Sequence, residues 1–116
     1  MRRYAVARAV SVARDLAAIR RHLTRSYEEF GDTRQSATER AAARLREAFD
    51  YMQTFATHPH RGTLHPELKA GIRHVTHRNF VFYFEIEEQS AEVKILAVFF
   101  GGTDHLRHIV EHLAKR

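Results

Sequence analysis

The chain contains no cysteine, which excludes disulfide bonds, thiolate metal ligands and cysteine nucleophiles. It also lacks any run near the roughly 18 apolar residues that a membrane-spanning helix needs. Its start, MRRYAVARAV, has neither the apolar core nor the cleavage site of a signal peptide. Without disulfides, the stability of the fold must come from packing alone. Without a membrane-spanning run or a signal peptide, we expect a cytoplasmic protein that has no membrane partner.

The sequence motifs of several enzyme classes are missing as well. No G-x-x-x-x-G-K-[ST], G-x-S-x-G or H-E-x-x-H occurs, so nucleotide hydrolysis, serine hydrolysis and zinc proteolysis lack support. His105, His108 and His112 would lie near one face of a helix, but three ligands from one short helix rarely converge on a tetrahedral ion. We therefore predict no metal site and no cofactor.

The composition is that of a folded globular protein. The 116 residues fit one domain, residues 1–116, with 44% hydrophobic and 28% charged residues. The net charge of +5 is uneven, because residues 1–27 hold seven arginines and one aspartate, whereas residues 28–116 hold 12 basic and 13 acidic residues. Such a basic segment suits nucleic acid, an acidic protein, an acidic tail or a solvated helix face, and charge alone does not choose among them.

The first half of the chain predicts a strand and two helices. Residues 3–9 alternate weakly as a short strand, and a helix follows with Ser11 as its N-cap and Gly31 as its end. Its apolar stripe consists of Val12, Leu16, Ile19, Leu23, Tyr27 and Phe30. Asp32 and Gln35 form a capping-box-like start to a second helix, residues 33–57, which ends before a proline. The two helices are expected to form an antiparallel hairpin.

The second half predicts a small sheet and a last helix. Residues 58–71, rich in proline, glycine and histidine, are expected to form a loop. Strands are predicted at residues 72–77, 80–87 and 93–100, with a tight connection at Arg78-Asn79 between the first two. In the last strand, strict alternation would place Val93, Ile95, Ala97 and Phe99 on one face and Lys94, Leu96, Val98 and Phe100 on the other. Thr103 is predicted to cap a C-terminal helix.

These elements define the expected fold class. It is α+β, with an N-terminal strand, an antiparallel helical hairpin packed on a small, mostly antiparallel sheet, and a C-terminal helix.

This order of elements, together with HPHRGTLHPELKAGIRHVTHRNFVFYFEI and VKILAVFFGGTDH, resembles the RelE/ParE toxin superfamily of bacterial type II toxin–antitoxin modules. The most specific points are Arg61-Gly62, Pro66-Glu67-Leu68, Gly71-Ile72-Arg73 and the FVFY strand, which match the ParE-like branch better than the ribosome-dependent nuclease branch. The resemblance covers nearly the whole chain. It implies a small toxin that a cognate antitoxin holds inactive by folding its carboxyl-terminal segment onto it.

Within this superfamily, ParE-like members poison DNA gyrase. The resemblance therefore implies a toxin that arrests growth by binding gyrase rather than by catalysis. The residues expected to contact the target or the antitoxin are Arg14, Arg20, Arg21, Arg25, Lys69, Arg73, Arg78, Phe80, Phe82, Leu96 and Phe100. The apolar members of this set are expected to lie on an uncovered side of the sheet and to meet the antitoxin.

The alternative is a RelE-like, ribosome-dependent mRNA endoribonuclease. Metal-free RNA cleavage needs a base, an acid and cations for the phosphate. The resemblance then gives Arg73 and His105 as catalytic residues, with Lys69 and Arg78 as phosphate contacts. No tyrosine follows Tyr83, although many nuclease relatives carry one near the end. A third possibility is an inactive toxin-fold protein that serves only as the partner of an antitoxin.

Overall fold

The structure, a computed structural model, describes residues 2–101 together with Ile109 and Glu111. The elements are β1 (Ala5–Arg8), α1 (Ser11–Glu29), α2 (Arg34–Gln53), the 3-10 helix η1 (Thr54–Ala56), β2 (Thr63–Leu64), β3 (Ile72–His77), β4 (Phe80–Glu87) and β5 (Glu92–Phe100). The predicted α+β class and helical hairpin are confirmed. The helix predicted from Thr103 lies outside the described residues, apart from Ile109 and Glu111. In the part of the chain that is described, no helix is both long and apolar enough to cross a bilayer.

The strands form one mixed sheet in the order β1-β5-β4-β3-β2. β1 runs parallel to β5, and the other neighbouring pairs are antiparallel. The connection at Arg78-Asn79 is a two-residue hairpin turn with φ values of 51° and 72°, as a type I′ turn requires. The prediction that residues 58–71 form only a loop is wrong at β2, because a two-residue strand carries no periodic signal.

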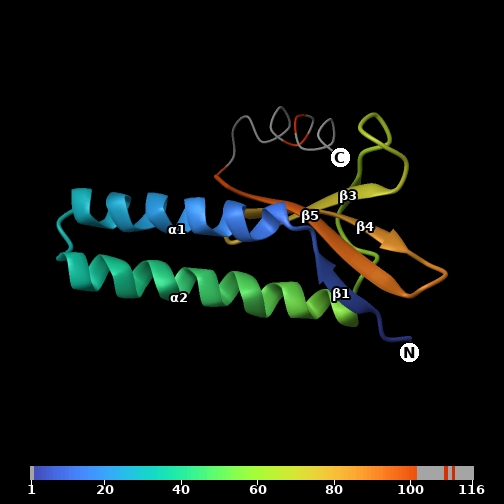
Figure 1. The fold of residues 1–116 in the computed structure, drawn as a ribbon, viewed down its shortest axis with the longest axis horizontal. Coiled ribbons are helices and arrows are strands. Elements are labelled where there is room, and N and C mark those ends of the chain that lie inside the picture. The colour runs from blue at the N-terminus through green and yellow to red at the C-terminus, as the bar shows by residue number, and fades with distance from the viewer. Residues whose placement is uncertain (1, 102–108, 110, 112–116) are drawn as a thin grey trace.

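The helices run side by side, and their connection projects beyond the sheet, at the end opposite to the N-terminus (Figure 1). Both begin differently from the prediction. Val10, not Ser11, is the N-cap of α1, and the Ser11 hydroxyl reaches β5 instead. Thr33, not Asp32, is the N-cap of α2, where its Oγ1 accepts a hydrogen bond from the backbone N–H three residues on. The predicted caps fail because each side chain has another partner in the fold.

β5 contains a bulge that changes which side chains face the helices. Tyr83 pairs with Ala97 but Phe84 pairs with Ile95, so Leu96 is an extra residue in β5. The core under the helices takes Val93, Ile95 and Val98 from β5, whereas Leu96, Ala97 and Phe99 join the cluster on the opposite face. The predicted strict alternation of residues 93–100 is therefore wrong beyond Ile95.

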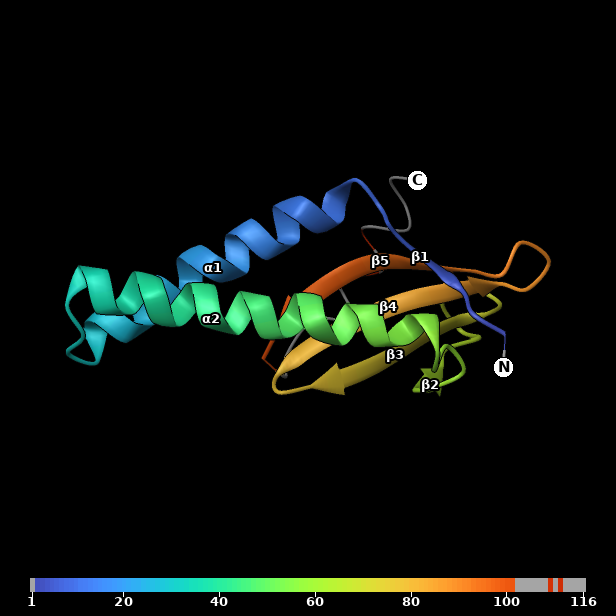
Figure 2. The same ribbon diagram turned by 90° about the horizontal axis from the view of Figure 1, so that it is seen from below.

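The helices cover one face of the sheet, and α2 runs over β4 at a shallow angle in Figure 2. Phe80 and Phe82 lie under the helices, where their side chains are 1% and 0% exposed. Leu96 is buried in the smaller cluster on the opposite face, which includes Ile109. The expectation that Phe80, Phe82 and Leu96 are accessible on an uncovered side of the sheet is therefore wrong, because both faces of the central strands are apolar and both are packed.

Arg61 closes the end of the second helix. Its Nε donates a hydrogen bond to the carbonyl of His58 at 2.6 Å, and its Nη2 donates to the carbonyl of Thr54 at 2.8 Å. The guanidinium also lies over the rings of Tyr51 and Phe55, 5.0 and 4.8 Å from their centroids. The arginine thus adds side-chain hydrogen bonds to carbonyl groups at the end of the helical segment and fixes where the chain turns towards β2.

Candidate interaction surface

The four predicted surface arginines of α1 lie on two flanks of the helix. Arg14, Arg21 and Arg25 are separated by seven and four residues and therefore share one face. Arg20 lies on the other flank, where it lines a hollow between α1 and α2. All four side chains are exposed, and none forms an ion pair or hydrogen bond with another described side chain. The helix thus presents basic groups on both flanks.

A groove runs between α1 and α2, and we call it the hairpin groove. It consists of two neighbouring hollows of about 220 and 290 Å³ that share Leu16 and Phe49. Val10 is 95% exposed and Phe49 is 38% exposed. The arginines of the hairpin groove are Arg8, Arg20 and Arg46. An apolar floor with basic side chains suits an amphipathic helix that carries acidic residues along its flank.

The cations predicted to contact phosphate do not converge. Arg73 is half-buried, and its register on β3 places it on the face that the helices cover. Arg78 lies five residues further along the chain, about 16 Å away at the usual rise of a strand, and its Nη1 is 3.2 Å from a carboxylate oxygen of Glu47. Lys69 is 3.5 Å from Glu85. Glu85 pairs with Ile72 in register and so faces the side of the sheet opposite to Arg73. The three cations therefore do not share one site, and Lys69 and Arg78 are each paired with a carboxylate.

A chain of titratable side chains, which the sequence did not predict, lies on the face opposite to the helices. Nε2 of His65 is hydrogen-bonded to Nδ1 of His74, and Nδ1 of His65 is 2.8 Å from Oε1 of Glu67. Both imidazole rings lie against Tyr83, with centroid distances of 5.8 and 5.5 Å. The hydrogen bond from His65 lowers the pKa of Glu67, and burial raises the pKa of Tyr83 to about 12. β2 creates this arrangement, since its pairing with β3 brings His65 beside His74.

A second group of side chains ties the N-terminal segment to the turn between β4 and β5. Glu88 accepts a hydrogen bond from the hydroxyl of Tyr4 at 3.1 Å, and its other carboxylate oxygen is 2.8 Å from Nε2 of His60. The hydrogen bond with His60 lowers the pKa of Glu88, while desolvation and the bond to Glu88 raise the pKa of Tyr4. These contacts make Glu88 a stabilising group only while it is ionised.

This group predicts a pH-dependent stability difference. The folded-state pKa of Glu88 lies below its unfolded value, so its stabilisation is present above the unfolded pKa and is lost as the pH falls through the folded pKa. We expect Glu88→Gln to be less stable than the wild type at neutral pH, and the difference to shrink by about pH 3. Urea unfolding at both pH values measures it, with Glu29→Gln as an exposed control. A difference that does not change with pH would contradict the role of ionised Glu88.

The remaining predicted histidines lie outside the described residues. These are His105, the expected catalytic partner of Arg73, and His108 and His112 of the histidine pattern. Among residues 2–101, 109 and 111, no three histidine or carboxylate side chains are placed to hold a metal ion.

Comparisons with known proteins place the fold. No protein-family model and no curated protein sequence matches the chain. The structure of the chromosomal ParDE toxin–antitoxin system from P. aeruginosa contains a similar chain, with a TM-score of 0.65 and 18% identity, covering 85% of this chain and 97% of that one. A chain of the RelBE2 toxin–antitoxin complex from Mycobacterium tuberculosis is also similar, with a TM-score of 0.60 and 18% identity. The match covers 86% of this chain and 93% of that one. The chain has the RelE/ParE fold. Since both branches share this fold, it does not separate gyrase inhibition from mRNA cleavage.

Proposed function

We propose that the protein is the toxin of a type II toxin–antitoxin pair, that it inhibits DNA gyrase by binding it, and that a cognate antitoxin neutralises it. The RelE/ParE fold supports the assignment to toxins. The observation that favours binding over RNA cleavage is the dispersal of Arg73, Lys69 and Arg78. Stabilising a phosphorane-like transition state requires cations that converge on one phosphate, and these three do not.

The arginines of α1 supply the binding surface in this proposal. Gyrase works on DNA as a large assembly, and a basic flank on a rigid helix suits contact with acidic protein or with phosphate. Arg14, Arg20, Arg21 and Arg25 are exposed and without ion-pair partners among the described residues. Their charge is therefore available for contact with the target.

The hairpin groove is the proposed binding site of the antitoxin. Its apolar floor includes Val10 and Phe49, which are costly to leave exposed to water. Arg8, Arg20 and Arg46 would pair with acidic residues on a docked helix. Because Arg20 belongs both to this groove and to the proposed target surface, an antitoxin bound there would block gyrase directly.

A supercoiling assay with purified protein free of antitoxin tests the proposal. We expect loss of supercoiling together with accumulation of cleaved DNA. Reversing all four α1 arginines to glutamate should weaken inhibition by about tenfold or more, as expected when several charge contacts are lost. Arg34→Glu, which reverses an exposed arginine at the start of α2, should change inhibition by less than about twofold. Normal supercoiling by folded protein that arrests growth would reject gyrase as the target.

One observation favours the alternative, ribosome-dependent mRNA cleavage. The pair His65 and His74, backed by Glu67 and set against Tyr83, can exchange protons along hydrogen bonds, as general acid–base catalysis needs. If this function holds, translated messages would be cut in the ribosomal A site, and His65→Ala would abolish the cuts while supercoiling stays normal. Primer extension on messages from cells that express the protein distinguishes the two functions.

A further inference from the structure

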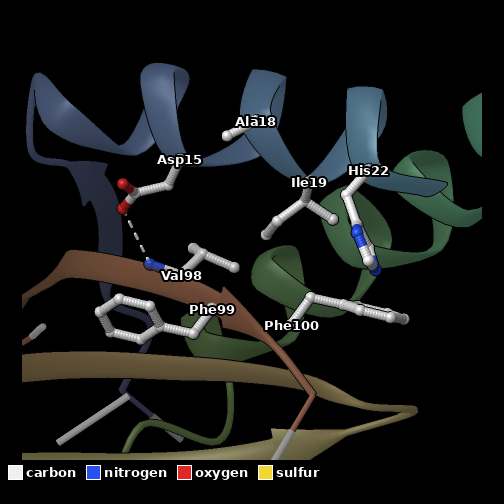
Figure 3. A pocket seen from close by; sticks show the side chains of 7 residues that line it. All are labelled: Asp15, Ala18, Ile19, His22, Val98, Phe99 and Phe100. Atoms are coloured by element: carbon white, nitrogen blue, oxygen red, sulfur yellow. Dashed lines mark hydrogen bonds between the residues drawn. The ribbon is translucent and has the colours of Figure 1, made fainter. Parts of the chain in front are cut away.

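The outer edge of β5 is only partly covered by another strand. β1 pairs with β5 along Glu92–Ile95, and beside residues 96–100 the described part of the chain places no strand on this edge. α1 makes two polar contacts here instead. The Ser11 hydroxyl donates a hydrogen bond to the carbonyl of the bulge residue at 3.4 Å, and Oδ2 of Asp15 accepts one from the N–H of Val98 at 3.1 Å (Figure 3). α1 thus substitutes for a neighbouring strand as far as Val98.

Beyond Asp15 a hollow of about 360 Å³ opens between α1 and β5. Figure 3 shows Ala18, Ile19 and His22 on its helix side and Val98 and Phe100 on its strand side. The N–H and C=O of one strand residue point to the same edge, and neighbouring residues alternate. Since the N–H of Val98 points to α1, the carbonyl of Val98 and both backbone groups of Phe100 point to this edge too. In the described part of the chain, no backbone group pairs with Phe100 there.

The arginines that share one flank of α1 border this hollow. Arg14 and Arg21 lie four and three residues from Ala18, and Arg25 lies three residues from His22, so each neighbours a lining residue on the helix surface. The hollow is thus apolar at its base, with the carboxylate of Asp15 bonded to Val98 at one end and three arginines along its helix rim.

We propose that this edge is a strand-addition site for an extended, acidic peptide segment of a partner protein. The segment's backbone would pair with the carbonyl of Val98 and with both backbone groups of Phe100, while the N–H of Val98 stays bonded to Asp15. An apolar side chain would enter the hollow, and acidic side chains would face Arg14, Arg21 and Arg25. The inference goes beyond the proposed function, because it concerns the edge of β5 rather than the hairpin groove and holds for either target. Arg14, Arg21 and Arg25 belong both to this site and to the proposed gyrase-binding surface.

The sequence of this edge supports a bound partner. Residues 96–100 read LAVFF, with no charged residue or proline of the kind that protects free strand edges from pairing. A second copy of this chain is a poorer occupant than an acidic segment. Pairing two β5 edges would bring two rows of arginines together, and like charges facing each other oppose association.

The test uses the whole protein and a labelled synthetic peptide, acetyl-Glu-Val-Glu-Val-Phe-Val-Glu-Val-Glu-amide. Its matched control has lysine in place of every glutamate, and a second control has proline beside the central phenylalanine to remove strand pairing. We expect the acidic peptide to bind at least about tenfold more tightly than either control in fluorescence anisotropy, since two or more charge contacts and the backbone pairing distinguish them. Amide signals of Phe100, Gly101 and His22 should shift on titration.

Variants of α1 locate the binding site. Arg21→Glu with Arg25→Glu should weaken binding about tenfold, and Ala18→Gln should weaken it by filling the hollow. Arg20→Glu, the same reversal on the other flank, should change affinity by less than about twofold. Equal binding of the three peptides, or signal changes confined to the hairpin groove, would overturn the proposal. The gyrase assay contains no peptide, so its outcome is independent of this one.

Discussion

Replacing Gly62 with alanine is expected to destabilise the protein by about 2 kcal/mol or more. Gly62 has a φ of 82°, and a Cβ at this position would lie 2.2 Å from the carbonyl oxygen of His74. That oxygen belongs to the backbone of β3 and cannot move without disturbing the sheet. Relief would require β2 to separate from β3, which would also part His65 from His74. Urea unfolding measures the loss of free energy, and the amide signal of His74 reports the separation.

Gly31→Ala is the matched control for this substitution. Gly31 also has a left-handed conformation, with a φ of 106°, but a Cβ there would have nothing within 4 Å. We expect a loss of about 1 kcal/mol from backbone strain alone. Equal losses in the two variants would show that the close approach to β3 is not what requires glycine at Gly62.

Replacing Phe55 with alanine is expected to cost about 3–5 kcal/mol, the largest loss that we predict for a single substitution. Phe55 is 0% exposed, and its ring centroid is 4.6 Å from that of Phe84 and 6.3 Å from that of Phe82. It also supports the guanidinium of Arg61, 4.8 Å from its centroid. The substitution therefore leaves a cavity in the core and loosens the end of the second helix.

Two further variants make this prediction measurable. A domain of this size is stable by about 5–15 kcal/mol, so Phe55→Ala would unfold the chain only at the low end of this range. Phe55→Leu keeps most of the volume and should cost about 1 kcal/mol. Phe30→Ala removes a phenylalanine that is 87% exposed, and its effect should stay within about 0.5 kcal/mol. A loss at Phe30 comparable to that at Phe55 would contradict the assignment of the core.

Local patterns in the sequence predicted much of the fold. Four of the six stripe residues of α1 are buried, since Val12, Leu16, Ile19 and Leu23 are 1%, 6%, 7% and 4% exposed. Tyr27 is half-buried, and the prediction is wrong at Phe30, which is 87% exposed because it lies at the C-cap, beyond the part of the helix that packs on the sheet. Gly31 ends the first helix with a positive φ, as predicted. These features depend on residues near in the chain, where periodicity and backbone preference act directly.

Features that depend on distant residues could not be predicted. Both faces of β4 are apolar, so its sequence does not tell which face the helices cover, and Phe80 and Phe82 were misplaced for that reason. The predicted caps failed because Ser11 bonds to β5 and Asp32 to Arg40. Packing between elements decides which face of β4 is covered and where the Ser11 hydroxyl bonds, whereas the ion pair of Asp32 with Arg40 is a local contact that competes with capping.

In the candidate surfaces, too, local features could be predicted from the sequence and features that depend on distant residues could not. The sequence identified the arginines of α1, and their spacing separates them into two flanks, but which flank borders β5 and which borders α2 depends on how the helix packs. The hollow beside Phe100 exists because β1 ends opposite Ile95. The sequence of β5 does not predict where its neighbouring strand ends. The pairing of His65 with His74 likewise depends on β2, whose two residues are too few to be detected.

The bulge at Leu96 also determines where this chain can differ in length from related chains. With Leu96 removed, Val93, Ile95, Val98 and Phe100 would alternate regularly and keep the faces that they have now. A deletion elsewhere in β5 would move the side chains of part of the strand to the opposite face of the sheet. A homologue with an unbroken strand should therefore be one residue shorter between Ile95 and Val98, and an alignment that moves this gap would exchange buried and edge-facing positions.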